Sequence, residues 1–222
     1  MNKVLVLAVH PDDETLGCGG TLLKLRDQGC ELHWLIATSI SQEGGYSPEF
    51  VEARRREIET VAQYYAFTGV HELGLPTARI ETVPLGSIVG RIAKVMKVLT
   101  PDTLFLPFRG DVHSDHRILF DAAFSCTKSF RQPSLRRIYM MEALSETEFS
   151  PAIPGLSFVP NTFVDISSHF DEKLEILQTY RSELGEHPFP RSMANVTALA
   201  TFRGANAGCR YAESFMLLKY IW

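Results

Sequence analysis

The sequence predicts an α/β protein in which helices cover both faces of an open, mostly parallel β-sheet. Short, continuous apolar runs, such as residues 4–9 and 32–37, are typical of strands that are buried on both faces. Between such runs, apolar residues recur at helical spacing, most clearly over residues 85–99. Strands that alternate with helices favour a parallel sheet with crossover connections, so this fold class is the first expectation.

The first half of the chain reads as strand, helix, strand, helix. After the first strand, the glycines among residues 17–20 predict a turn, and the helix that follows ends at Gly29. After the second strand, Ser47 and Pro48 fit an N-cap followed by proline at the first helical position. Apolar residues at helical spacing continue from there, so a long second helix is expected.

The next elements continue this alternation. Residues 70–75 and 102–108 read as the third and fourth strands, with the helix at residues 85–99 between them. Ser114 is expected to cap a fourth helix, and residues 136–143 read as the fifth strand. In a doubly wound sheet these five strands take the order 3-2-1-4-5, to which C-terminal strands are added.

The last third of the chain is less regular. Residues 157–166 read as an extended segment, and residues 167–184 read as a capped helix that a glycine ends. Two prolines among residues 186–192 predict a loop, because proline does not fit a helix interior. Residues 211–222 are expected to return to the sheet as a strand.

Composition and charge limit the classes of partner. The 222 residues carry a net charge of -4, so the chain has no basic excess for phosphate contacts and no nucleic acid is expected. Four well-separated cysteines without a C-x-x-C pair fit a reducing cytoplasm. No apolar segment has the length of a signal-peptide core or a transmembrane span. Residues 1–222 are expected to form a single domain, and the sequence leaves a homo-oligomer open.

Two clusters of histidine and acidic residues follow predicted strands. Residues 10–14 (HPDDE) come directly after the first strand, and residues 113–116 (HSDH) come after the fourth. The first and fourth strands are neighbours in the order 3-2-1-4-5, at the point where the chain direction reverses and a ligand crevice opens. The two clusters are therefore expected to face each other across this crevice.

The residue types in these clusters fit a catalytic metal site. His10, Asp13 and His116 supply two imidazoles and one carboxylate, and three protein ligands with an open position are typical of a catalytic metal. A metal lowers the pKa of its bound water towards neutrality, and Asp12 is placed to remove a proton as the water attacks a carbonyl. Adjacent acids repel one another unless a cation neutralises them. The clusters therefore predict metal-dependent hydrolysis.

Three further residues are candidates for supporting roles. His113 is placed to stabilise a developing oxyanion and to protonate a leaving amine. Asp115 is expected to hydrogen-bond an imidazole and fix its tautomer and charge. Arg54, early in the second helix, is a candidate to bind a substrate oxygen or stabilise charge, although a solvated helix face also explains the arginines at positions 54–56.

These motifs resemble those of the PIG-L/LmbE-like family of metal-dependent de-N-acetylases. Residues 8–22 (AVHPDDETLGCGGTL) resemble the family's opening signature, and residues 110–117 (GDVHSDHR) resemble its H-x-D-H signature. Residues 52–62 (EARRREIETVA) are similar to its arginine-bearing helix, and residues 208–215 (GCRYAESF) to its C-terminal segment. Asp111 stands where some relatives carry a tyrosine, and this departure is expected in a substrate-facing part of the site.

The resemblance implies a Rossmann-like fold and a zinc-dependent hydrolase, with iron(II) and cobalt(II) as metals that such ligands also accept. It implies removal of an N-acetyl, or another small N-acyl, group from a small-molecule amino-sugar conjugate. The positions that it implies for the metal ligands, the general base and the supporting groups are those derived above, and Arg54 falls where the family has an active-site arginine. The segment 185–196 matches no pattern of a relative.

Two other functions use the same residues. An iron(II)-dependent oxygenase also takes two histidines and one carboxylate, but it has no need of a base such as Asp12 beside the water. A non-catalytic sugar- or nucleotide-binding module of the same fold is expected to lack a ligand or the base, and none is missing here. The glycines near position 19 also lack the G-x-G-x-x-G spacing of a dinucleotide site.

Overall fold

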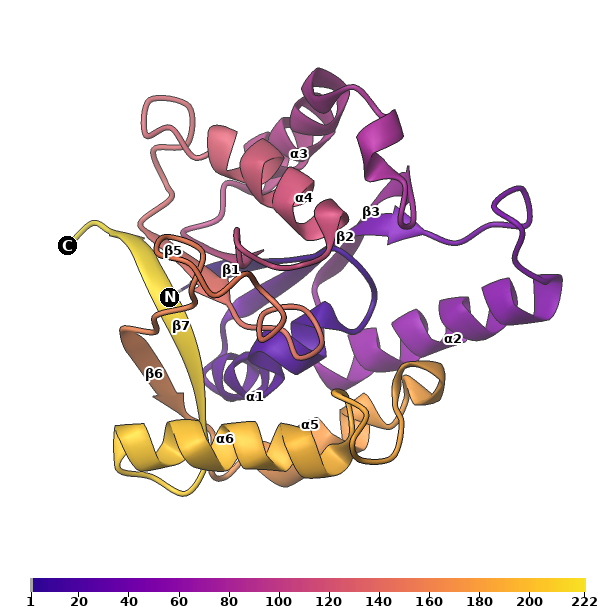
Figure 1. The fold of residues 1–222 in the computed structure, drawn as a ribbon. Helices are drawn as coiled ribbons and strands as arrows, with labels where there is room; N and C mark the ends of the chain where they lie inside the picture. Colours follow the sequence, from indigo (N-terminus) through magenta and orange to yellow (C-terminus); the bar gives the residue numbers. More distant parts are fainter. Residues whose placement is uncertain (1) are drawn as a thin grey trace.

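The computed structural model describes residues 2–222 and contains a seven-stranded sheet between two layers of helices (Figure 1). The strand order is β3-β2-β1-β4-β5-β7-β6. The first five strands pair in parallel, and β7 runs antiparallel to both β5 and β6. The predicted α/β class and the order 3-2-1-4-5 with added C-terminal strands are therefore confirmed.

The elements have the following bounds. The strands are β1 (Lys3–Ala8), β2 (Glu31–Ser39), β3 (Gly69–Pro76), β4 (Thr103–Pro107), β5 (Arg137–Met141), β6 (Thr162–Asp165) and β7 (Ala212–Tyr220). The α-helices are α1 (Asp13–Asp27), α2 (Pro48–Tyr64), α3 (Leu85–Leu99), α4 (Ser114–Ser125), α5 (Phe170–Leu177) and α6 (Met193–Ala207). Two short 3₁₀ turns are η1 (Ile80–Thr82) and η2 (Arg181–Glu183).

Each face of the sheet packs against its own set of helices. Leu5 and Leu7 of β1 point into the core shared with α3 and α4, whereas Val4 and Val6 point into the core shared with α1 and α2. Figure 1 shows α5 and α6 on the same side as α1 and α2. This arrangement explains why β1 reads as a continuous apolar run, since both of its faces are buried.

The predicted turn at residues 17–20 is wrong, because these residues lie inside α1. The helix is instead broken at Cys18, which has non-helical φ and ψ of -149° and 21°. The glycines serve close packing: a Cβ atom built on Gly20 would lie 2.8 Å from the Cβ atom of Ile166. Glycine is needed at position 20 because Ile166 packs closely against it, and not because the chain turns there.

The C-terminal third departs furthest from expectation. The predicted helix over residues 167–184 is too long, since α5 ends at Leu177 and η2 follows, and α6 is not predicted at all. Helix α6 buries Val196, Ala200 and Gly204, which are too small to make a marked apolar stripe. Strands β6 and β7 lie within the predicted extended segments. Within residues 2–222, no helix is long and apolar enough to cross a membrane.

Candidate active site

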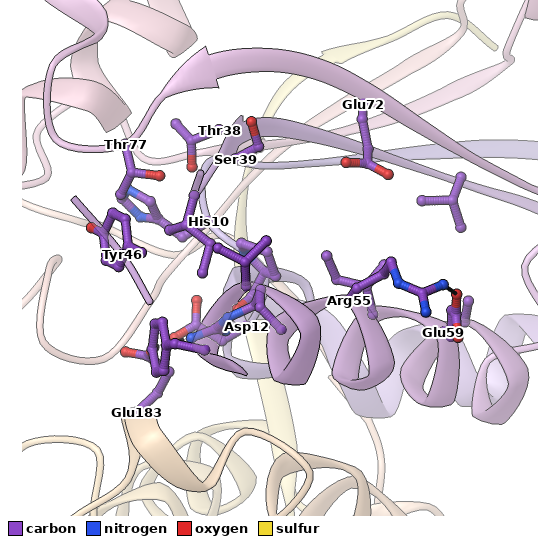
Figure 2. A pocket seen from close by; sticks show the side chains of 18 of the residues that line it. His10, Asp12, Thr38, Ser39, Tyr46, Arg55, Glu59, Glu72, Thr77 and Glu183 are labelled. Carbon is purple, nitrogen blue, oxygen red and sulfur yellow. Dashed lines mark hydrogen bonds and ion pairs between the residues drawn. The ribbon is translucent and has the colours of Figure 1, made fainter. Parts of the chain in front are cut away.

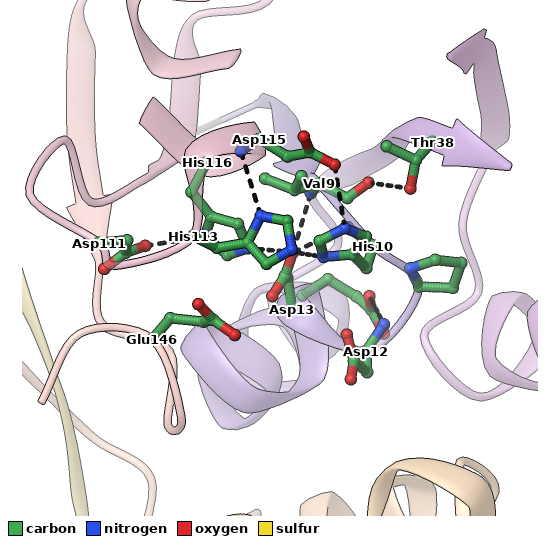
Figure 3. A network of polar contacts seen from close by, with 12 residues as sticks. Val9, His10, Asp12, Asp13, Thr38, Asp111, His113, Asp115, His116 and Glu146 are labelled. Carbon is green, nitrogen blue, oxygen red and sulfur yellow. Dashed lines mark hydrogen bonds and ion pairs between the residues drawn. The ribbon is translucent and has the colours of Figure 1, made fainter. Parts of the chain in front are cut away.

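The two polar clusters meet at the carboxyl ends of β1 and β4 (Figure 3). His10, Asp13 and His116, the three predicted metal ligands, each offer one ligand atom, and these atoms lie within 4.8 Å of one another. The rings of His10 and His116 have centroids 5.5 Å apart. The topology therefore brings together two segments that are more than a hundred positions apart in the sequence.

Asp13 is the central carboxylate of this group. Its Oδ2 atom accepts hydrogen bonds from the backbone N–H groups of Val9 and His10, both at 2.9 Å, and lies 3.5 Å from Nε2 of His116. Burial opposes the charged form, but the imidazoles of His116 and His10 and these two hydrogen bonds lower the pKa of Asp13. The group is therefore an ionised acceptor that faces both histidines.

His116 presents one ring nitrogen to Asp13 and the other to Asp111. Nδ1 lies 2.8 Å from Oδ2 of Asp111, while the buried Nε2 has no hydrogen-bond partner among residues 2–222. Burial alone would lower the pKa of His116, but the Asp13 and Asp111 carboxylates raise it to about 9. The expectation that Asp111 faces substrate is wrong: its side chain is fully buried behind His116, because the loop after β4 turns it inward.

His113, and not Ser114, is the N-cap of α4. Its Nδ1 atom accepts a hydrogen bond of 3.1 Å from the backbone N–H of Asp115, so a neutral ring carries its proton on Nε2. Burial and the nearby His10 lower the pKa of His113, which favours this neutral form. His113 lines the cavity described below, with its ring centroid 4.9 Å from that of His10. A neutral N–H donor thus stands beside the three clustered residues.

Asp115 faces His10 rather than the ring of His113. Its Oδ2 atom lies 3.6 Å from Nε2 of His10, and its two carboxylate oxygens accept from the backbone N–H groups of Ala78 and Ile80 at 2.8 and 3.3 Å. His10, His113 and Asp115 also offer ligand atoms within 4.8 Å of one another. In that second group, however, Nδ1 of His113 is already engaged as the helix cap.

Asp12 occupies a strained turn at the start of α1. Its φ of 147° lies in a region that side-chain-bearing residues rarely adopt. The backbone is held on both sides, since its N–H donates to Oε2 of Glu14 at 3.1 Å and its carbonyl accepts from Thr15 and Leu16 at 3.0 and 2.9 Å. Burial, followed by the charge of Asp13, raises the pKa of Asp12. The carboxylate lines the cavity next to His10.

Glu14 is fully buried beneath this turn, and its replacement by glutamine should change the pH dependence of stability. Burial raises its pKa from 4.5 to about 7, although Thr15 and Tyr180 hydroxyls donate to its Oε1 atom at 2.7 and 2.9 Å. The folded protein therefore keeps a proton on Glu14 that the unfolded chain loses near pH 4.5, so the free energy of unfolding falls as the pH rises through this window.

Glutamine does not titrate, so the free energy of unfolding of the Glu14→Gln variant lacks this pH dependence. Between acidic solution and about pH 8, the difference in free energy of unfolding between variant and wild type should shift by about 3 kcal/mol in favour of the variant. Urea unfolding of both chelator-treated proteins at the two ends of this range measures the difference. Parallel stability curves for the two proteins would contradict the assignment of a neutral Glu14 in the folded state.

A cavity of about 690 Å³ is lined by His10, Asp12 and His113 and by several residues of α2 (Figure 2). Its lining includes apolar side chains, among them Tyr46, Phe50, Val51, Ile58, Ala62 and Val70. It also includes polar and charged side chains, among them Thr38, Ser39, Glu72 and Thr77. The rings of Tyr46 and Phe50 stack with centroids 5.9 Å apart. The cavity therefore offers both apolar and polar contacts and reaches His10 of the cluster.

Arg54 and Arg191 contact the turn at Asp12. Arg54 is buried, donates from Nη1 to the carbonyl of Pro11 at 3.0 Å and pairs with Glu183. Nη1 of Arg191 lies 3.4 Å from Oδ2 of Asp12, and Nη2 lies 3.4 Å from Glu183. Arg191 was not predicted as a site residue. It lies in the segment 185–196, which matches no pattern of a relative, so no motif pointed to it.

A family comparison decides the assignment of the chain. The family model described as PIG-L, GlcNAc-PI de-N-acetylase, matches residues 5–127, which contain both polar clusters. The chain belongs to the PIG-L family. This membership confirms the predicted resemblance and the predicted reaction class, hydrolytic removal of an N-acetyl group from an amino-sugar conjugate.

Relatives of this PIG-L protein include deacetylases from different organisms. It is 28% identical over 231 residues to a diacetylchitobiose deacetylase of Thermococcus kodakarensis, covering 100% of this chain and 85% of the relative. It is 27% identical over 190 residues to a probable N-acetyl-alpha-D-glucosaminyl L-malate deacetylase 2 of Bacillus cereus, covering 81% and 83%. The solved N,N'-diacetylchitobiose deacetylase of Pyrococcus horikoshii superposes with a TM-score of 0.78 at 22% identity, covering 98% and 84%, and shows the same fold.

The PIG-L match covers some residues of the site and not others. It spans Arg54 and both polar clusters, whereas Arg191 lies beyond its end at residue 127. Arg55, next to Arg54, is exposed and pairs with Glu52 and Glu59 on the same helix face. Of the three adjacent arginines, only Arg54 is buried against the site.

Proposed function

We propose that this PIG-L protein is a zinc-dependent hydrolase that releases acetate from a small N-acetylated amino-sugar conjugate. The observation that carries the proposal is the convergence of His10, Asp13 and His116 beside a cavity that His10 itself lines. Within residues 2–222, the buried Nε2 atoms of both histidines have no hydrogen-bond partner, as expected of a site that fits a cation. Two imidazoles and one carboxylate suit zinc, and the same donor set accepts iron(II) and cobalt(II).

Asp12 and His113 would carry the proton transfers. His10, Asp13 and His116 would hold a divalent cation, which would supply a Lewis acid and lower the pKa of a water at the site. The Asp12 carboxylate, poised at the cavity wall, takes the proton from the attacking water. The Nε2–H group of His113 donates a hydrogen bond to the developing oxyanion, and Asp12 passes the proton that it took from the water to the leaving amine.

The remaining predicted residues would hold these groups in place. Oδ2 of Asp115 lies 3.6 Å from Nε2 of His10, and Nδ1 of that ring lies 4.0 Å from Asp13, so the Asp115 charge would orient the His10 ring. Arg54 fixes the carbonyl of Pro11 and thereby the strained Asp12 turn. Its guanidinium is occupied by these contacts, so we assign it to positioning, and the predicted contact with substrate stays a prediction.

The volume and the lining of the cavity support an amino-sugar conjugate. A volume of about 690 Å³ is in the range of clefts that bind small organic molecules. A pyranose ring presents C–H groups on its faces and hydroxyls at its edge, which matches a lining that combines apolar side chains such as Tyr46 and Phe50 with polar side chains such as Thr38 and Glu72. A cytoplasmic location, a single domain over residues 1–222 and a homo-oligomer stay predictions from the sequence.

The test combines metal analysis with a reaction assay. Purified protein is expected to contain one divalent metal per chain and to release amine and acetate from at least one of a panel comprising N-acetylglucosamine, N,N'-diacetylchitobiose and N-acetylglucosaminyl malate. A chelator should abolish release, and added zinc should restore it. Metal without release from any conjugate would contradict the sugar assignment. Oxygen-dependent turnover would favour an oxygenase, and absence of bound metal would favour a binding module.

A further inference from the structure

The Asp111 carboxylate has a set of contacts that the reaction scheme does not use. The side chain is fully buried, and both oxygens are engaged: Oδ2 lies 2.8 Å from Nδ1 of His116, and Oδ1 accepts from the hydroxyl of Thr147 at 2.6 Å. The Thr147 hydroxyl in turn accepts from the backbone N–H of Ala143 at 2.9 Å. The carboxylate is thus fixed between the turn after β5 and the His116 ring.

This contact determines the tautomer of His116. A carboxylate accepts only, so Nδ1 must carry the proton and the lone pair of a neutral ring lies on Nε2. Nε2 is the buried nitrogen without a hydrogen-bond partner, and it lies 3.5 Å from Oδ2 of Asp13. The ring therefore presents its basic nitrogen to the same point as Asp13.

The energetic cost of burying carboxylates next to His116 also points to a cation. Two acids, Asp13 and Asp111, are at most 3% exposed and lie 3.5 and 2.8 Å from the two nitrogens of the His116 imidazole. A buried carboxylate is costly unless charge or hydrogen bonds compensate it, and one imidazolium does not balance two carboxylates. His33 makes an ordinary histidine–acid pair at 2.8 Å with Glu31, but that carboxylate is 40% exposed and needs no such compensation.

We infer that Asp111 is a positioning residue for the metal of this chain, acting through His116. Its negative charge increases the donor strength of Nε2, and its hydrogen bond fixes the ring, so that loss of either weakens metal binding. Outer-sphere carboxylates of this kind are worth about 10- to 100-fold in metal affinity. The inference rests on the proposed function for the identity of the ligand set.

The experiment measures cobalt(II) affinity by competition with a chromophoric chelator, without substrate. Asp111→Asn keeps the shape and an acceptor oxygen but loses the charge, and should bind cobalt(II) about tenfold more weakly. Asp111→Ala loses both and should bind about 100-fold more weakly. In the NMR spectrum of the cobalt protein, a paramagnetically shifted, exchangeable proton from Nδ1 of His116 should persist in the asparagine variant and exchange away in the alanine variant.

Asp121→Asn is the matched control, because Asp121 lies on α4 with His116 but is half-exposed and pairs with Arg109 at the surface. It should bind cobalt(II) as wild type does. Wild-type affinity in Asp111→Ala, or equal weakening in Asp121→Asn, would overturn the inference. If the alanine variant does not fold, the isosteric asparagine variant decides. Wild-type metal binding without hydrolysis of any conjugate would contradict the proposed function alone, whereas a wild type that binds no cobalt(II) would overturn both.

Discussion

Replacement of Asp12 by asparagine is expected to lower acetate release by about two to four orders of magnitude while the metal stays bound. The carboxylate lines the cavity but is not one of the three clustered ligand residues, so its loss removes the base and leaves the cation site intact. Asparagine is the appropriate replacement, because its shape preserves the strained turn at φ 147°. Alanine should give a similar loss of rate, with the turn less well supported.

His116→Ala provides the contrast for the Asp12 variant. It removes one of the three clustered ligand residues, so both the metal and the activity should be lost. Metal content by elemental analysis and single-turnover acetate release, measured on both variants, separate the two roles. Loss of metal in Asp12→Asn would mean that the roles of the two adjacent aspartates are exchanged, and a full metal complement in His116→Ala would refute the ligand set.

Replacement of Lys173 by methionine is expected to destabilise the fold by about 3–5 kcal/mol, the usual effect of removing one partner of a buried ion pair. Nζ of Lys173 lies 2.7 Å from Oε1 of Glu213, and both side chains are almost fully buried. Without the lysine, Glu213 becomes an unpaired charge in the interior.

This ion pair also joins the two halves of the broken helix α1. Lys173 donates to the carbonyl of Leu16 at 3.0 Å, before the break, and Glu213 accepts from the backbone N–H groups of Gly20 and Thr21 at 2.8 and 2.7 Å, after it. These are the backbone groups that a helix end leaves unpaired. Because Asp13 begins the same helix, the variant should also lose activity.

Urea unfolding monitored by circular dichroism measures this effect. Lys24→Met is the control, since Lys24 lies on α1 and its ammonium makes a hydrogen bond at the surface, to the carbonyl of Asp165. That variant should stay within about 0.5 kcal/mol of wild type. Adding Glu213→Gln to Lys173→Met should recover part of the loss, because it removes the unpaired charge. Equal stability of Lys173→Met and Lys24→Met would contradict this account of the break in α1.

Patterns with large apolar residues at a regular period were sufficient for most of the fold. Helix α3 lies at residues 85–99 as expected, because Ile88, Ile92, Met96 and Leu99 form its buried stripe. Helix α6 was missed because its buried face consists of small residues, and Gly204 has Cys209 and Arg210 backbone atoms within 3 Å of where its Cβ would be. Packing of that kind depends on the neighbouring chain and leaves little periodic signal.

The order of the first five strands and the proximity of residues 10–14 to residues 113–116 could be predicted from the sequence, because they follow from apolar periodicity and from the position of each cluster after a strand. Which acid contacts which imidazole could be seen only in the folded structure. It places Asp111 on His116 and Asp115 on His10, and it supplies Arg191 to Asp12 from a distant loop. Hydrogen-bond partners depend on side-chain directions within a few ångströms, and residue spacing along the chain does not encode those directions.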